Sequence, residues 1–221
     1  MCGRINVHEH EGVRALLAEL GLSLTTDFTP RYNIAPTQDI LTVALNDRQT
    51  PEIMTMRWGI MPVWAKPGQF RAPLFNARSE TVFEKASFRN LVKRQRILVP
   101  VNGFYEWQKK TTGGKQAFYL HPAASDTMFI GGIFQHLHDG SSEACLLTTS
   151  ANATMAPIHD RMPVIVPIRD ALTWLTEHDR DLVCRKMNPA AEDTLEALPI
   201  GDFVNNSRHE GARCMEPVDA Q

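Results

Sequence analysis

The sequence lacks long apolar runs and a marked excess of either charge. Its 221 residues include 23 basic and 25 acidic side chains, giving a formal net charge of −2. No segment is long and apolar enough to cross a bilayer, and charged residues from Arg4 onward interrupt any signal-peptide core. We therefore expect a cytoplasmic protein with no membrane partner. The charge argues against a generally basic nucleic-acid coat, but leaves room for a local basic groove.

Cysteine is scarce, and the four that occur, Cys2, Cys145, Cys184 and Cys214, lie far apart. No pair has the CxxC spacing of a zinc knuckle or a redox pair, so reduced thiols are the simplest interpretation. The sequence also lacks a P-loop, a GxGxxG fingerprint and an HExxH zinc motif. We expect neither a metal nor a cofactor.

The composition is that of an ordinary globular protein, with 43% hydrophobic and 22% charged residues. The chain is long enough to bury a sizeable core, and no repeat or low-complexity linker divides it. Many short apolar segments predict a mostly antiparallel sheet or barrel. We expect one α+β domain over residues 1–221, with a β-rich, barrel-like core, flanking helices and a monomeric state.

Strands are predicted at residues 5–7, 40–45, 52–58, 97–101, 104–107, 117–120, 128–134, 144–149 and 164–166. Helices are predicted at 9–20, 81–92 and 170–177, with weaker patterns at 180–187 and 189–198. Residues 25–36, 61–73 and 203–221 are predicted to be loops or irregular, and 109–115 a hairpin tip. Asp170 is a plausible helix cap. Asn102-Gly103 is a strong two-residue turn signal, although the short arms also permit a bulge.

Position 2 carries the residue with the most distinctive chemistry. Removal of Met1 would give Cys2 a free α-amine beside its thiol. The amine can form a Schiff base with an aldehyde, and the thiol can then close a five-membered thiazolidine. With ordinary pKa values of about 8 for the amine and about 8.5 for the thiol, neither group needs a large shift to react. The alternative is an incidental cysteine on a frayed terminus.

Glu106 lies between Tyr105 and Trp107, directly after an apolar strand. Apolar surroundings raise the pKa of a carboxyl group, which suits a general acid. The alternative is a structural glutamate that is paired with an arginine or exposed on the outer face of the sheet. The residue alone does not separate these interpretations.

His159 begins a polar patch before an apolar strand, together with Asp160 and Arg161. An imidazole there can shuttle a proton near neutral pH, and its neighbours can orient it or bind a phosphate. The alternative is a histidine hydrogen-bonded inside a turn. A lone histidine more often has that structural role.

Asn76 and Arg78 would face the same way in an extended segment. The amide suits a sugar hydroxyl and the guanidinium suits a phosphate, although an Asx-turn beside a surface arginine is the plainer alternative. Trp64 lies in a proline-rich loop, where it can stack on a base or pack into the protein. A basic run (Arg89, Lys93, Arg94 and Arg96) is interpreted as a solvated helix face.

Together these stretches resemble the SOS response-associated peptidase family, whose domain is called SRAP. The matching segments are Cys2-Gly3-Arg4, Arg31-Tyr32-Asn33-Ile34-Ala35-Pro36, Trp58-Gly59, Asn76-Ala77-Arg78-Ser79-Glu80, Gly103-Phe104-Tyr105-Glu106-Trp107 and His159-Asp160-Arg161-Met162-Pro163. Residues 204–207 resemble the closing segment of the family. The order and separations match along nearly the whole chain.

The resemblance implies covalent capture of abasic sites in single-stranded DNA through a thiazolidine at Cys2, with the protein at the nucleoid when engaged. By the same resemblance, Glu106 is the acid/base, His159 lies near the Schiff base, and Asn76 orients the sugar. The implied DNA contacts are Arg4, Asn33, Pro36, Trp64, Arg78 and Arg161. The family name implies a peptidase, acting on its own initiator methionine.

Two other functions fit the same residues. In the first, Cys2 is the nucleophile of an N-terminal-nucleophile peptidase, with His159 or its own amine as base. In the second, Arg78, Trp64 and Arg161 form a non-covalent single-strand binding module and Cys2 has no role. Peptide turnover would favour the first, and equal binding of intact and abasic DNA would favour the second.

Overall fold

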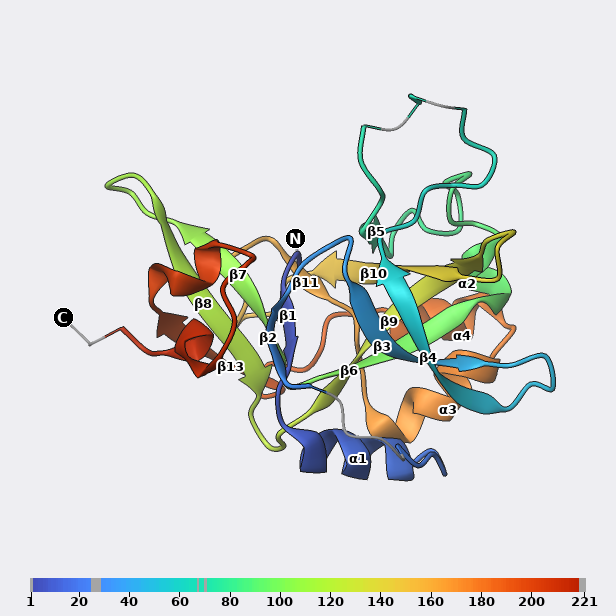
Figure 1. Cartoon of the computed structure of the whole chain (residues 1–221), viewed down its shortest axis with the longest axis horizontal. Helices are drawn as coiled ribbons and strands as arrows, with labels where there is room; N and C mark the ends of the chain where they lie inside the picture. Colours follow the sequence, from blue (N-terminus) through green and yellow to red (C-terminus); the bar gives the residue numbers. More distant parts are fainter. Residues whose placement is uncertain (1, 25–28, 67, 70, 219–221) are drawn as a thin grey trace.

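A computed structural model describes residues 2–24, 29–66, 68–69 and 71–218, and these residues form two β-sheets with helices on the outside (Figure 1). The smaller sheet has five strands in the order β13-β8-β7-β1-β2. Its strands in chain order are β1 (Ile5–Val7), β2 (Arg31–Ile34), β7 (Gly103–Lys109), β8 (Lys115–Pro122) and β13 (Leu195–Ile200). All four pairings in this sheet are antiparallel.

The larger sheet closes on itself. Its strands are β3 (Asp39–Leu45), β4 (Pro51–Trp58), β5 (Asn76–Arg78), β6 (Arg96–Val101), β9 (Met128–His136), β10 (Ser142–Ser150), β11 (Arg161–Pro163) and β12 (Ile165–Val166). Because β10 pairs with both β4 and β9, the strands β3, β4, β10, β9 and β6 form a ring. Only the pairings of β10 with β4 and β5 are parallel among the described strands. The prediction of a mostly antiparallel, barrel-like α+β core is confirmed.

Four α-helices occur among the described residues: α1 (His10–Ala18), α2 (Leu91–Arg94), α3 (Ile168–Thr176) and α4 (Arg180–Lys186). The Glu9 carboxylate caps α1 by accepting from the N–H groups of Glu11 and Gly12. Gly21, at φ 71°, takes the left-handed conformation just beyond the helix end. The helix predicted at 9–20 is thus confirmed with shorter ends, and the helix predicted at 180–187 matches α4. No described helix has the length and hydropathy that crossing a membrane requires.

Strand β6 lies at the centre of the core, and all six of its residues are buried. It pairs with β3 on one side and β9 on the other. Helix α3 packs against it, and the Trp174 indole N–H donates to the Ile97 carbonyl at 2.9 Å. The continuous apolar run at 97–101 therefore forms the buried strand that its sequence predicts.

Three predicted segments were wrong. Residues 81–90 form a series of turns in place of the helix predicted at 81–92, and only α2 follows. Residues 31–34 form β2 inside a predicted loop, and 195–200 form β13, which overlaps the end of the helix predicted at 189–198. Both strands pair with partners distant in sequence, which outweighs local propensity.

Asn102-Gly103 is not a hairpin turn, because β6 and β7 belong to different sheets. The Asn102 side-chain oxygen accepts from the N–H groups of His8 and Glu9 at 2.7 and 3.0 Å. A Cβ at Gly103 would lie 2.3 Å from the Tyr119 ring, so this close approach needs glycine. The junction therefore fixes the start of α1 while the chain passes between sheets.

Three further predictions concern a helix cap, the C-terminal segment and a hairpin tip. Asp170 does not cap α3, which follows Pro167; its carboxylate accepts from Lys186 Nζ at 2.6 Å. The segment predicted to be irregular contains two 3₁₀ turns, η1 (Asp202–Asn205) and η2 (Ala212–Met215). The hairpin tip predicted at 109–115 is confirmed, with Lys109 opposite Lys115.

Candidate active site around Cys2

The start of the chain lies between the two sheets. Strand β1 pairs with β7 so that Ile5 is opposite Phe104, and the Tyr105 N–H donates to the Arg4 carbonyl at 2.9 Å. Continuing this register places Glu106 on the part of β7 that runs alongside the segment before β1. Cys2 is only 1% exposed, so it is not a frayed terminus. In Figure 1 the N-terminus lies between the smaller sheet and the end of β5.

Asn76 connects Cys2 to the larger sheet. It begins β5, which pairs with β10, and its side-chain Nδ2 donates to the Cys2 carbonyl at 2.6 Å. Its Oδ1 is buried and accepts no hydrogen bond from the described residues. The amide therefore holds the reactive residue with one end, while the other is an acceptor for which the described protein provides no donor.

Burial and, to a smaller extent, the Glu106 carboxylate together raise the pKa of the Cys2 thiol to about 12, while a hydrogen bond from the Arg4 backbone opposes the shift. Glu106 itself is 5% exposed on β7. The expectation that the thiol needs no large pKa shift was therefore wrong, because the sequence did not reveal its burial. At neutral pH the thiol keeps its proton, and Glu106 is the carboxylate near enough to influence it.

His159 stands where the chain enters β11. Its Nδ1 lies 2.9 Å from the Arg161 backbone nitrogen and 2.9 Å from the Asp160 Oδ1. The first contact needs an unprotonated Nδ1 and the second a protonated one, so the two contacts favour opposite protonation states. Gln108 Nε2 donates to the Pro157 carbonyl at 2.7 Å, which ties this segment to the end of β7 beyond Glu106.

Arg161 holds two of the matching segments together. Its Nη1 and Nη2 donate to the two Glu80 carboxylate oxygens at 2.5 and 2.8 Å, and Nη2 also donates to the Thr148 carbonyl at 2.7 Å. This hydrogen-bonded pair lowers the pKa of Glu80. Because Arg161 is 8% exposed and engaged within the protein, its hydrogen bonds give it a structural role, and the predicted phosphate contact stays a prediction.

Arg4 and Asn33 also serve the fold. Arg4 Nη1 donates to the Asn33 Oδ1 at 2.5 Å and to the Val204 carbonyl at 2.9 Å. Asn33 is fully buried, and its Nδ2 donates to the carbonyls of Asn206 and His209 at 3.0 and 2.9 Å. Burial lowers the pKa of Arg4. These contacts hold the C-terminal segment beside the site, and the DNA contacts predicted for both residues stay predictions.

The other predicted DNA contacts lie nearer the surface. Arg78 is exposed, Pro36 is half-buried, and Trp64 is 50% exposed. Trp64 belongs to the segment between β4 and β5, which projects in Figure 1 on the same side of the molecule as the N-terminus. Because these three side chains are at least partly exposed, DNA could reach them, and their DNA contacts stay predictions.

Neither of the two cavities described in the structure includes Cys2, Asn76, Glu106 or His159. The described residues contain no group of three or more histidine, cysteine or acidic side chains that could hold a metal ion. Met1, whose removal the Cys2 chemistry needs, lies outside the described residues. The arrangement offers a buried nucleophile, a neighbouring carboxylate and an amide tether.

The fold and site define a β-rich protein that encloses an N-terminal cysteine between two sheets. The chain belongs to the SOS response associated peptidase (SRAP) family, whose model matches residues 1–207, so the predicted membership is confirmed.

Named relatives align over most of the chain. It is 31% identical over 196 residues to the abasic site processing protein YoqW of Bacillus subtilis (strain 168), covering 86% of this chain and 87% of the relative. It is 29% identical over 231 residues to the abasic site processing protein YedK of Escherichia coli (strain K12), covering 99% and 100%. A crystal structure of a Bacteroides thetaiotaomicron protein shares the fold, with TM-score 0.82 and 19% identity over 97% of this chain and 99% of the other.

Proposed function

We propose that this protein processes abasic sites by capturing them covalently in single-stranded DNA through Cys2, which shields the lesion. The observation that carries the proposal is the enclosed Cys2, tethered by Asn76 and influenced by Glu106. The names of the aligned relatives support the same lesion as substrate. A single strand suits the site because its splayed backbone exposes the sugar.

The chemistry proceeds in two steps once Met1 has been removed. The Cys2 amine attacks the C1′ aldehyde of the ring-opened sugar, and loss of one water gives an imine. The thiol then adds across the C=N bond: sulfur bonds to carbon, and the thiol proton ends on nitrogen. No oxidant or other reactant is consumed.

Glu106 provides the proton path in the second step. Because the thiol pKa is raised, sulfur must lose a proton as it attacks. Glu106 accepts that proton and delivers it to the nitrogen. His159 moves the protons that opening of the thiazolidine or strand cleavage would need.

The neighbouring groups bind the flanking strand. The buried Asn76 Oδ1 accepts a hydrogen bond from a sugar hydroxyl. Arg78 binds a phosphate, while Trp64 and Pro36 contact a base or sugar. Each neutralised phosphate adds about −0.7 to the log–log salt slope of initial binding, while the covalent product is salt-resistant.

The test is a denaturing gel after incubation with an oligonucleotide that carries one abasic site. Mass measurement first confirms that Met1 is absent. Wild type should give a shifted band with abasic DNA but not with intact DNA, and Cys2→Ala should give none. Cys2→Ser should form only an imine that needs a reductant to survive denaturation. A stable Cys2→Ser adduct without reductant, or no wild-type adduct, would contradict the proposal.

A further inference from the structure

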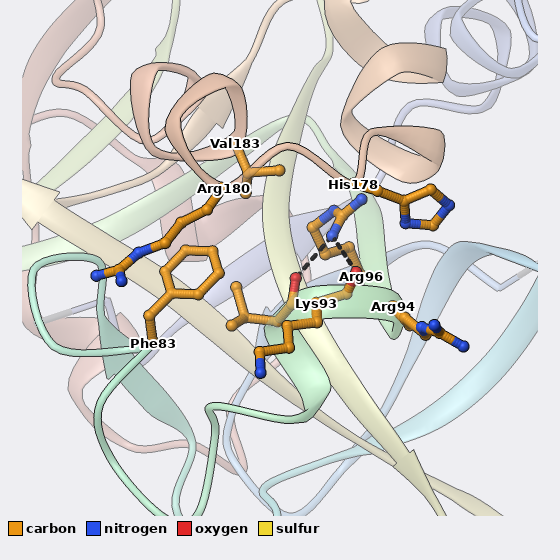
Figure 2. A pocket seen from close by; sticks show the side chains of 8 residues that line it. Phe83, Lys93, Arg94, Arg96, His178, Arg180 and Val183 are labelled. Carbon is orange, nitrogen blue, oxygen red and sulfur yellow. Dashed lines mark hydrogen bonds between the residues drawn. The ribbon is translucent and has the colours of Figure 1, made fainter.

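A second site lies away from Cys2, between the turns that follow β5 and the start of α4. It is a cavity of about 440 Å³ lined by Phe83, Val92, Lys93, Arg94, Arg96, His178, Arg180 and Val183. Four of these residues are lysine or arginine, one is histidine, and none is acidic. Figure 2 shows Arg96 at the centre, with Lys93, Phe83 and Arg180 on one side and His178 and Arg94 on the other.

Arg96 places a charge in the wall of the cavity. It is 2% exposed, and its guanidinium donates only to backbone carbonyls, those of Val92, Lys93, Trp174, Leu175 and Glu177. Burial lowers the pKa of Arg96 to about 10, so it remains protonated at neutral pH. The interpretation of this basic run as a solvated helix face was therefore wrong for Arg96, which begins a core strand.

The other cations keep donors for a ligand. Lys93, Arg94 and Arg180 are exposed, and their side chains donate no hydrogen bond and form no ion pair within the described part of the chain. Arg180 covers the Phe83 ring at 5.1 Å, which holds its guanidinium at the cavity. The cluster is thus positioned by the fold while most of its donors remain available.

Two carboxylates flank His178 in the sequence, and both accept hydrogen bonds from backbone N–H groups. The Glu177 carboxylate accepts from the N–H groups of His178 and Asp179, each at 2.7 Å. The Asp179 carboxylate caps α4 by accepting from Asp181 and Leu182. Among the described residues, neither carboxylate forms an ion pair with Lys93, Arg94 or Arg180, although the charge of Glu177 raises the pKa of Arg96.

We propose that this cavity binds the phosphate monoester of a nucleotide or of a nucleic-acid strand end. A monoester carries a charge of about −1.5 to −2 at pH 7, more than a backbone diester, so it gains most from several converging cations. The volume lies in the usual range for small-ligand sites, roughly 300–1,000 Å³, and exceeds what a phosphate alone fills. The apolar wall of Phe83, Val92 and Val183 can contact the attached nucleoside.

The proposal is independent of abasic-site processing, because none of the residues placed in that site lines this cavity. The test is an NMR titration with adenosine monophosphate, adenosine, and a short single-stranded oligonucleotide with either a 5′-phosphate or a 5′-hydroxyl. The variant K93E/R94E removes two cations of the cavity. The matched control R48E/K110E changes exposed residues on two hairpin tips and gives the same net charge, from −2 to −6, because each replacement subtracts two.

Wild type and R48E/K110E should show saturable amide shifts at residues 92–96 and 178–183 with at least one phosphorylated probe. Adenosine and the 5′-hydroxyl strand should give none. The affinity should fall at least tenfold in K93E/R94E, and unchanged amide shifts elsewhere will show that the variant is folded. Arg180→Gln, which leaves α2 intact, should weaken binding as well.

The probes also separate the two sources of the monoester. Saturable binding of the nucleotide alone identifies a free nucleotide, and binding of the phosphorylated strand alone identifies a strand end. Binding of both supports the shared chemistry. No binding of either, equal binding of the unphosphorylated probes, or an equal loss in R48E/K110E would overturn the proposal.

Discussion

At the scale of single residues, the Asn76 amide has two distinct ends. One end holds the Cys2 carbonyl at 2.6 Å, and the other is a buried oxygen that no described donor reaches. A buried acceptor without a donor costs stability, on the order of 1–3 kcal/mol, unless water or a ligand satisfies it. The position therefore favours binding over stability.

We predict that Asn76→Ala slows adduct formation at least tenfold while changing the free energy of unfolding by only about 1 kcal/mol, since a hydrogen bond is lost but an unpaired acceptor is removed. Single-turnover gel assays and urea unfolding measure the two effects. Asn90→Ala is the control, because Asn90 makes no side-chain cap bond on α2. Loss of adduct formation in proportion to unfolded protein would show that Asn76 is only structural.

The burial of the thiols gives a second prediction at this scale. Burial raises the pKa of Cys2 to about 12 and that of Cys145 still higher, whereas Cys184 is only half-buried. Iodoacetamide at pH 7.5 should therefore label Cys184 first in the native protein and Cys2 only after unfolding. Peptide mass mapping over time measures the order. Rapid native labelling of Cys2 would show that the thiol is exposed in solution.

At the scale of elements, the sequence predicts strands with a continuous or alternating apolar pattern, such as β6, and misses those whose partners are remote. Strand β2 lies between Pro30 and Pro36, which are loop signals, yet it pairs with β1. Strand β13 contains Pro199 and still pairs with β8 along its whole length. Neither partner choice is visible in local propensity, because pairing depends on which distant strands the fold brings alongside.

For the site residues too, the sequence predicts some features and misses others. The residue types of Cys2 and Glu106 indicate their chemistry from sequence, and the structure adds that burial makes the thiol a weak acid. Arg161 illustrates what sequence misses: an arginine is equally suited to a phosphate and to a carboxylate, and only the fold shows that Glu80 occupies it. The sequence does contain a clue, because Glu80 lies in one of the segments that match the family. It does not indicate which arginine pairs with Glu80.

The Glu80–Arg161 pair joins the turn after β5 to β11, and it should depend on pH. Arg161 lowers the pKa of Glu80 below its ordinary value of 4.5, so the pair stabilises the fold above that pH and is lost as the pH falls. Since the Glu80 side chain is 49% exposed, we expect Glu80→Gln to cost only about 1 kcal/mol, which lowers Tm by about 2–4 °C.

Thermal unfolding of wild type and Glu80→Gln between pH 3 and 7 measures this effect. The difference in Tm should be present at pH 7 and shrink towards pH 3. Glu52→Gln, an exposed change on β4, is the control. A difference that grows as the pH falls would contradict the pairing.

At the scale of the whole molecule, the segment after residue 207 completes the fold although the family model ends there. Gly201 N–H donates to the Glu216 carbonyl, and Val218 N–H to the Pro199 carbonyl, so the segment covers the outer edge of β13. The Glu210 carboxylate accepts from the Tyr32 N–H at 2.7 Å, and Cys214 is buried. A covered edge also limits pairing with other chains.

We predict that deleting residues 208–221 destabilises the protein by about 3 kcal/mol, or roughly 6–12 °C in Tm, and promotes aggregation, because β13 loses its cover and the buried Asn33 amide loses its hydrogen bond to the His209 carbonyl. Calorimetry and light scattering measure both effects. Deleting the exposed hairpin-tip residues 111–113 is the control for shortening the chain. An unchanged Tm in the truncated protein would show that these contacts contribute nothing.

The tether between Cys2 and Asn76 also has a consequence for the order in which the protein is made. During synthesis Cys2 emerges from the ribosome early. Asn76 follows 74 positions later, and Glu106 and His159 later still. During that interval the cysteine has neither its enclosure nor its neighbouring carboxylate. If Cys2 captures an aldehyde as proposed, the enclosure that would select the aldehyde forms only after the later strands have been made and have packed around the first residues.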